Sequence, residues 1–526
     1  MRRTFHSQTM PCSPLDKQQL PAGLNFSNET FHLGVAAMSG FPQTMEFARL
    51  NRPIGIEWTA RNLPVQGAIP SEIKGAFFRA VPDPAFPPLF PQDSILSADG
   101  MVSRFNISNG AVDHDIRYLH TPRFEAERRA RRALFGRYRN PYTDLPEVQQ
   151  VDRAVANTTP VWHGGRLFMT KEDALAYEVN PHTLETVGPW TYDGQLRSPT
   201  MTAHPRIDPV TGEMFMFGYE VGGLCSDEVA YFIADRDGKL ISEQWFKAPY
   251  CSLMHDFGLT ERWVVFTVFP TKTDLARLKQ GGAHWHHEQD GDCWIGIMPR
   301  YGKVSQIRWF KGPKGVFAFH FINSYDEGDL VHIDLCLADS NPFPFIRAER
   351  GDFRPVFELN MRSERWTFDL SAPGESFSMR PLCPPGDLPR VRDAEQARPY
   401  TKFWMPSMNP QGGPPVPGGP VGAQFNCLLQ LDLAGGPPML AQFGPATAVS
   451  EPVHVTSSTP GHEGWLLLVV DYEIDEHNHR SELVVLEAGC IAAPPLARVP
   501  LPVPLHPQIH GCWVSAEQMA TSRLRG

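Results

Sequence analysis

One stretch of the chain, Leu253-Met-His-Asp-Phe-Gly-Leu-Thr-Glu-Arg-Trp-Val-Val-Phe-Thr-Val-Phe269, decides the class of fold. A histidine follows two apolar residues, a turn signal comes next, and a run rich in valine and phenylalanine then has the composition of a strand. His204 and His320 stand in similar settings, each followed by a turn and another strand-like run. This loose repeat indicates that each histidine ends an inner strand of a repeated β-unit.

Strand-like runs and turn signals alternate along the rest of the chain, from about residue 56 onward. Proline and glycine are frequent, with 51 and 43 residues, which suits a fold with many tight turns. This pattern predicts an all-β sandwich, barrel or propeller. The runs include Arg166–Thr170, Met214–Phe217, Leu330–Leu335 and Trp465–Val470.

Among these architectures, a propeller gives the distant histidines a place to meet. The innermost strand of each blade runs along the central axis, so equivalent strand ends from different blades converge. His510 lies near the C-terminus, where a last strand would close the ring. We therefore expect His204, His255, His320 and His510 to lie together on the axis of a β-propeller.

Such a set of imidazoles predicts a metal site, although the ligand type alone suits iron, zinc, copper and nickel. On an octahedral ion, four histidines would leave two positions for dioxygen, water or substrate. Acidic residues would be expected to orient the imidazoles through their second ring nitrogens. The competing interpretation is a metal-free propeller that serves as a binding scaffold and carries these histidines incidentally.

Composition excludes several other classes of function. The formal charge of −10 argues against nucleic acid as a partner. The longest apolar run, Trp465–Val470, is far shorter than the ~18 residues of a transmembrane helix. The nine cysteines are scattered and contain no Cys-x-x-Cys pair, which favours a reducing compartment, the cytoplasm. We expect residues 1–45 to be an irregular N-terminal arm and residues 46–526 to form a single catalytic domain; the sequence predicts no particular oligomeric state.

Two segments depart from the strand pattern. Arg123–Phe135 is rich in alanine, arginine and glutamate and is expected to form a helix on a loop between blades, or to contact a membrane surface. His284, His286 and His287 form a local cluster that competes with the four separate histidines. Consecutive side chains in a polar loop point in different directions, so we interpret these three as loop residues.

At the four separate histidines the sequence resembles the carotenoid cleavage oxygenase family, and within it the branch that cleaves stilbenes. The resemblance runs from Phe77 to Trp513 and implies a seven-bladed β-propeller, with loops and short helices forming a dome over one Fe(II) held by the four histidines. The motifs that carry it are Ser97–Val102, Ala156–Thr159, Ala203–Pro205, Met254–Asp256, Phe319–Glu327, Ser450–Val453 and Ile509–Gly511.

The resemblance also implies roles for residues around the metal. Glu172 and Glu451 match carboxylates that bond to the ligand histidines. Asp387 stands where the family has a glutamate, and because aspartate is one methylene shorter, we expect its contact to be longer or bridged by water. Thr158 matches a residue beside a vacant iron position.

Tyr138 and Lys171 match the pair that grips the 4-hydroxyl group of a stilbene. Leu96 stands where an aromatic residue is expected. The resemblance thus implies a dioxygenase that cleaves the central C=C bond of a 4-hydroxystilbene, of resveratrol or lignostilbene type, with O2 to give two aromatic aldehydes. The alternatives are cleavage of a carotenoid or apocarotenoid, or of a phenylpropanoid alkene of isoeugenol type.

Overall fold

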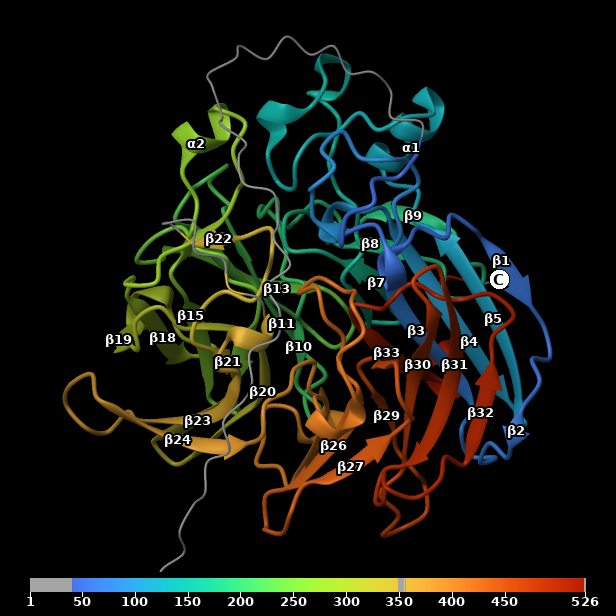
Figure 1. Ribbon diagram of the computed structural model, residues 1–526. Helices are drawn as coiled ribbons and strands as arrows, with labels where there is room; N and C mark the ends of the chain where they lie inside the picture. Colours follow the sequence, from blue (N-terminus) through green and yellow to red (C-terminus); the bar gives the residue numbers. More distant parts are fainter. Residues whose placement is uncertain (1–39, 349–353, 355, 525–526) are drawn as a thin grey trace, which may run out of the picture. The chain divides into compact units, whose positions relative to one another are not determined.

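Antiparallel sheets arranged as blades make up most of the protein in the computed structural model (Figure 1). The structure describes residues 40–348, 354 and 356–524, and Gly40–Gly526 form one compact unit. Seven of the sheets are blades, as predicted. Residues 1–39 of the predicted N-terminal arm lie outside the described residues, and the boundary at residue 45 stays a prediction.

Four of the blades each consist of four strands that follow one another outward from the inner strand. The bounds of these strands are β6 (Thr159–His163), β7 (Arg166–Thr170), β8 (Tyr177–Val179) and β9 (Thr186–Pro189); β10 (Arg206–Ile207), β11 (Met214–Tyr219), β12 (Glu228–Ala234) and β13 (Leu240–Lys247); β14 (Phe257–Leu259), β15 (Trp263–Val268), β18 (Cys293–Pro299) and β19 (Arg308–Gly312); β20 (Phe317–Glu327), β21 (Leu330–Ala338), β23 (Arg362–Asp369) and β24 (Phe377–Cys383).

The other three blades have three, six and five strands, and in the six-stranded blade β29 pairs with β30 outside the main order of the other five. Their bounds are β25 (Lys402–Ser407), β26 (Cys427–Asp432) and β27 (Met439–Gln442); β2 (Gln66–Gly67), β32 (Ala497–Pro500), β31 (Asn478–Glu487), β30 (Trp465–Asp475), β28 (Thr447–Val449) and β29 (Val453–Val455); β1 (Trp58–Ala60), β5 (Ala111–Tyr118), β4 (Gly100–Ser108), β3 (Gly75–Pro82) and β33 (Gly511–Ser515).

Strands inside a blade are apolar throughout because both of their faces are covered. Every residue of β11 is buried. Successive side chains of a strand point to opposite faces, and those of β11 enter two different hydrophobic clusters. Phe215 and Phe217 pack into one cluster, whereas Met214 and Met216 pack into the other. The continuous apolar run thus results from blades stacked on both sides.

The ring closes by pairing the two ends of the propeller sequence. β33 pairs antiparallel with β3, with Gly511 opposite Arg79. The last strand therefore lies in the same blade as strands near the start of the chain. This closure, which the sequence around His510 predicts, brings the segment before β33 to the inner strands of the other blades.

Short helices and one small sheet lie on one side of the blades (Figure 1). They are α1 (Pro122–Ala130), α2 (Leu275–Lys279), and a sheet of β16 (Thr271–Lys272), β17 (His286–His287) and β22 (Arg347–Ala348). α3 (Ala516–Ala520) follows β33. Among the described residues, no helix is long and apolar enough to cross a membrane.

The helix expected over Arg123–Phe135 is shorter than predicted. Thr121 caps α1, and Arg131 ends it with a left-handed backbone (φ 55°). The backbone N–H groups of Leu134 and Phe135 then donate to the Glu127 carboxylate, at 2.8 and 3.1 Å. These hydrogen bonds hold the chain in a return loop, so the last five residues of the predicted helix are not helical.

Candidate metal centre

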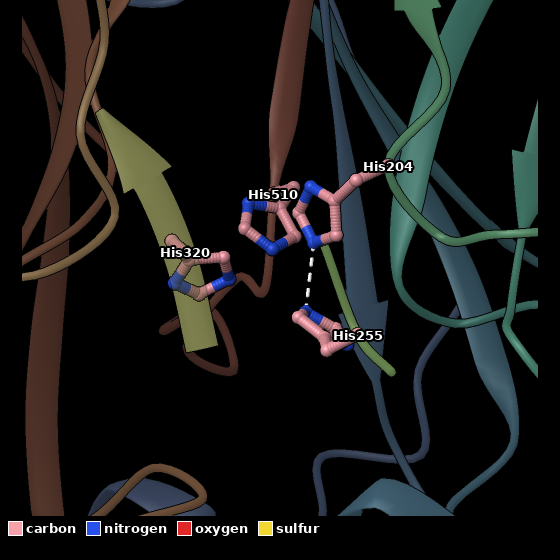
Figure 2. Close-up of side chains that lie close together, drawn as sticks. All are labelled: His204, His255, His320 and His510. Carbon is pink, nitrogen blue, oxygen red and sulfur yellow. Dashed lines mark hydrogen bonds between the residues drawn. The ribbon is translucent and has the colours of Figure 1, made fainter. Parts of the chain in front are cut away.

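Four histidines from four different blades meet in the structure, as the sequence predicts (Figure 2). One ring nitrogen from each of His204, His255, His320 and His510 lies within 4.8 Å of all the others. The Nε2 atoms of His204 and His255 are 2.8 Å apart. Figure 2 shows the four rings grouped around a common point, approached from separate strands and loops.

The histidines do not end inner strands, contrary to expectation, but mostly precede them. His204 comes two residues before β10, His255 two before β14, and His510 immediately before β33. His320 lies inside β20, where the pairing register with β21 shifts between Ala318 and Phe321. Such a bulge re-aims a side chain within a strand, which is how His320 reaches the centre.

The donor atoms fit a divalent transition metal ion. The Nε2 atoms of His320 and His510 are buried and have no hydrogen-bond partner among the described residues. A buried polar atom without a partner is costly unless a ligand satisfies it. Imidazole binds metal in its neutral form, and burial lowers the pKa of His204, His255 and His510. At His320, burial is outweighed by Asp387, which raises the pKa.

Carboxylates contact the Nδ1 atoms of the histidine rings, so that the Nε2 atoms face the centre of the group. Glu172 lies 2.5 Å from His255 Nδ1, and Glu451 lies 3.1 Å from His510 Nδ1. Burial alone would raise the pKa of Glu172, but His255 and its hydrogen bond lower it to about 2. Glu451 also accepts from the Gly511 backbone N–H at 2.8 Å and pairs with Arg390 at 3.2 Å. Both carboxylates are therefore anionic and fixed in position.

Asp387 reaches its histidine directly, which corrects the expectation of a longer or water-bridged contact. Its Oδ1 lies 2.7 Å from His320 Nδ1 and accepts from the Leu388 backbone N–H at 2.9 Å. Leu388 has a left-handed backbone (φ 56°). The turn at Leu388 directs its N–H to the Asp387 carboxylate, and the shorter side chain still reaches the ring.

We expect Asp387→Asn to weaken metal affinity by about 10- to 100-fold, because a neutral amide no longer raises the basicity of the His320 ring. Competition between the protein and a chromophoric chelator for Co(II) measures this loss. Asp369→Asn, which removes a carboxylate at the end of β23 in the same blade, serves as the control. Equal affinity of the two variants would contradict this role of Asp387.

Tyr138 and Lys171 are buried side by side, each with a defined set of partners. Lys171 Nζ lies 5.2 Å from the centroid of the Tyr138 ring. It donates to the Leu96 carbonyl at 2.9 Å and to Asn157 Oδ1 at 3.3 Å. The Tyr138 backbone N–H donates to the buried Asp93 carboxylate at 2.8 Å. The ammonium group is thus anchored at the face of the tyrosine ring.

The loop that carries Tyr138 depends on a close backbone approach. A Cβ atom at Gly136 would lie 2.1 Å from Thr143 Oγ1, so only glycine fits. The Gly136 N–H donates to Asp144 at 2.7 Å, and Arg137 N–H donates to Thr143 Oγ1 at 2.8 Å. These contacts tie the loop to itself and present Tyr138 to the interior.

Asn157 is a site residue that the sequence does not single out. Its side chain makes four hydrogen bonds, the full capacity of an amide. It donates to the carbonyls of Leu96 and Ala98 and accepts from Lys171 Nζ and Thr158 Oγ1. Thr158 is therefore joined to Lys171 through one side chain. Its place beside an open iron position stays a prediction.

Aromatic contacts connect the histidine centre with Tyr138. The Phe319 ring stacks on His255 at 3.5 Å, and Phe343 lies 4.6 Å from Phe319. Phe345 follows at 5.3 Å and lies 5.3 Å from the Tyr138 ring. A cavity of about 940 Å³ opens beside Tyr138 and Phe345. This aromatic path consists of ring contacts that join the two regions through packed side chains, and a flat aromatic substrate would pack against such rings.

The local histidine cluster is not a set of loop residues, which corrects the sequence-based interpretation. His286 and His287 form β17, and His284 and His287 are buried. His287 hydrogen-bonds with Thr271 and with the Gly315 carbonyl. His284 hydrogen-bonds with Glu220 and with the Arg139 carbonyl. Among the described residues, only the four separate histidines form a group suited to a metal ion.

Comparison with known proteins identifies the class to which this fold and site belong. A family model described as retinal pigment epithelial membrane protein matches residues 51–515. The chain belongs to this family, the carotenoid cleavage oxygenases, as its sequence motifs indicate. It is therefore an oxygenase of this family.

Two relatives and one crystal structure match most of the chain. The chain is 39% identical to an isoeugenol monooxygenase of Pseudomonas putida, covering 88% of this chain and 96% of that protein. It is 37% identical to lignostilbene-alpha,beta-dioxygenase isozyme III of Sphingomonas paucimobilis, covering 92% and 99%. The crystal structure of a lignostilbene dioxygenase from Pseudomonas brassicacearum matches with a TM-score of 0.86 and 37% identity, covering 91% of this chain and 100% of that chain.

Proposed function

We propose that this protein is a non-haem Fe(II) dioxygenase, with one ion per chain, that cleaves the central C=C bond of 4-hydroxystilbenes. O2 is the second substrate and two aromatic aldehydes are the products. The observation that carries the proposal is the buried pair of Tyr138 and Lys171, joined by an aromatic path to four convergent histidines. The similarity to lignostilbene dioxygenases supports it.

Lys171 is the group that would bind the phenol oxygen. Two of its three N–H groups are engaged by Leu96 and Asn157, so the third is left for a ligand as far as the described residues show. Burial lowers the pKa of Lys171, against the opposing charges of Asp173 and Glu172. A lysine with a lowered pKa can stand as the neutral amine, whose lone pair accepts the proton of a phenol of similar acidity. The N–H formed in this way is the third one, and it faces the phenolate.

The chemistry would follow from a phenolate formed at one end of the substrate. Lys171 and Tyr138 hold the phenolic oxygen and stabilise its negative charge, which then spreads through the ring to the alkene. Fe(II) at the four histidines supplies binding and activation of O2. The two oxygen atoms of O2 would add across the C=C bond. Cleavage of that bond and of the O–O bond then leaves one carbonyl on each carbon, so that atoms and electrons balance.

An isoeugenol-type phenylpropanoid is a second candidate substrate, favoured by the 39% identity to an isoeugenol monooxygenase. It carries a 4-hydroxyl group on a ring conjugated to an alkene, so the same Lys171 and Tyr138 would bind it. We also propose that the enzyme works in the cytoplasm, because all eight cysteines of the described residues are free thiols.

A substrate panel tests the proposal. The iron-reconstituted protein is incubated under air with resveratrol, a methoxylated 4-hydroxystilbene, isoeugenol and a β-apocarotenal, and the aldehydes are separated by chromatography. We expect cleavage of the hydroxystilbenes with a kcat/KM at least about tenfold above that for isoeugenol, since a second ring adds buried apolar surface. Cleavage of the apocarotenal alone would refute the proposal.

A further inference from the structure

Arg139, next to Tyr138 in the sequence, is a buried cation that the proposed reaction does not yet use. Its side chain is 4% exposed. The guanidinium lies over the rings of Tyr219 and Trp285, with its Cζ atom 4.9 and 5.1 Å from their centroids. A charge is this deeply buried only when partners compensate its lost hydration.

The strongest partners of the Arg139 head group are a carboxylate and a hydroxyl. Arg139 Nη2 pairs with Glu220 Oε2 at 2.5 Å, and Nη1 donates to the Tyr219 hydroxyl at 2.5 Å. His284 completes this arrangement, because its Nε2 lies 3.1 Å from Glu220 and its Nδ1 lies 2.8 Å from the Arg139 carbonyl. These residues hold both the head group and the backbone of Arg139.

The guanidinium also lies close to a carboxylate of the metal centre. Nη1 lies 3.8 Å from Glu172 Oε1, while the second oxygen of Glu172 contacts His255 at 2.5 Å. Tyr138 directly precedes Arg139 on the loop that His284 holds through the Arg139 carbonyl, 2.8 Å from its Nδ1. Burial, followed by Glu172, raises the pKa of Tyr138, and Arg139 opposes this rise. Arg139 thus stands between the tyrosine of the phenol pair and the carboxylate of the metal centre.

The backbone adopts an uncommon conformation at both residues of the Arg139–Glu220 ion pair. Arg139 has φ 54° and Glu220 has φ 55°, both in the left-handed region that non-glycine residues rarely adopt. Two strained residues that face each other across one ion pair indicate that the surrounding structure enforces their positions.

We propose that Arg139 is a positioning residue that couples the two halves of the site, holding Glu172 against His255 and, through the loop that it shares with Tyr138, keeping the Tyr138 ring beside Lys171. Glu220, Tyr219 and His284 form the clamp that keeps the guanidinium in place. The phenol half of this inference rests on the proposed function, whereas the metal half does not.

The test uses the full-length protein loaded with Co(II), whose visible spectrum reports the geometry of its ligands. Removing Arg139 alone would leave the buried Glu220 carboxylate without its guanidinium partner, so the main variant is Arg139→Met/Glu220→Gln, which removes both charges together. Arg139→Lys keeps the charge but not the planar fork. The matched control is Arg365→Met/Asp334→Asn, which removes another buried pair, 2.7 Å apart, in which the arginine side chain is 10% exposed.

Two quantities are measured without oxygen, so that nothing is turned over. The first is Co(II) affinity by chelator competition, which we expect to fall about tenfold in Arg139→Met/Glu220→Gln, with a changed visible spectrum. The second is the affinity for 4-hydroxystilbene relative to unsubstituted stilbene, followed by quenching of protein fluorescence. We expect this preference to fall at least fivefold, with Arg139→Lys between the parent and the double variant.

The control variant should lose thermal stability but keep both quantities. The proposal is overturned if Arg139→Met/Glu220→Gln matches the control in either quantity, because coupling requires both to change. A parent protein that shows no preference for 4-hydroxystilbene over stilbene refutes the proposed phenol site and the coupling with it. In that case a loss of Co(II) affinity still identifies Arg139 as a positioning residue for the metal centre alone.

Discussion

Lys171→Met lowers kcat/KM for a 4-hydroxystilbene by about 100- to 10,000-fold, the range that a positioned proton-transfer group contributes. Methionine has a similar length but neither charge nor donor, so it cannot stabilise a phenolate. It also leaves the acceptors that Lys171 satisfies, the Leu96 carbonyl and Asn157 Oδ1, short of one hydrogen bond each. The rate is measured by the appearance of the aldehyde product, with the iron content of each preparation determined separately.

A substrate without the phenolic proton distinguishes a chemical role of Lys171 from a structural one. For the matching 4-methoxystilbene, which has no acidic proton, we expect a slow reaction in the parent and the same slow reaction in Lys171→Met. Lys272→Met is the matched control, because Lys272 Nζ also lies over a tyrosine ring, 4.4 Å from the centroid of Tyr250, but on the small sheet. Full activity of Lys171→Met on the hydroxystilbene would refute the assignment of the phenol site.

Removal of one central imidazole is expected to have an even larger effect. In His320→Ala, Fe(II) affinity falls well beyond the roughly 10- to 100-fold that loss of an outer partner costs. After reconstitution and desalting, the parent should retain one iron per chain and the variant almost none. Cleavage activity falls with the iron content. Elemental analysis and an assay on the same samples check both statements.

His287→Ala is the control variant, because it removes a buried histidine that does not belong to the group of four. His287 is fully buried and hydrogen-bonded, but it belongs to β17 and lies outside the group of four. We expect this variant to be less stable and to bind iron like the parent. If the parent itself retained no iron, or if His320→Ala retained a full equivalent, the protein would be a propeller scaffold with incidental histidines.

The residue types and their local order were enough to predict much of this protein. Strand geometry is local, so apolar runs such as Met214–Phe217 and the turns between them indicate an all-β fold without any knowledge of partners. The similar settings of His204, His255 and His320 predict that these distant residues meet, and they do, although His320 lies inside its strand and the other two precede theirs. Family resemblance then implies the number of blades, which the structure bears out.

Only the tertiary structure decided how the side chains meet, because contacts between distant segments leave no trace in local composition. A bulge in β20 turns His320 to the centre, and the left-handed Leu388 brings Asp387 within 2.7 Å of it. Glu220 lies 81 residues from Arg139 in the chain and yet pairs with it at 2.5 Å. In sequence, Arg139 is one more charge in a polar loop; packing of the blades against that loop makes it a buried cation beside Glu172.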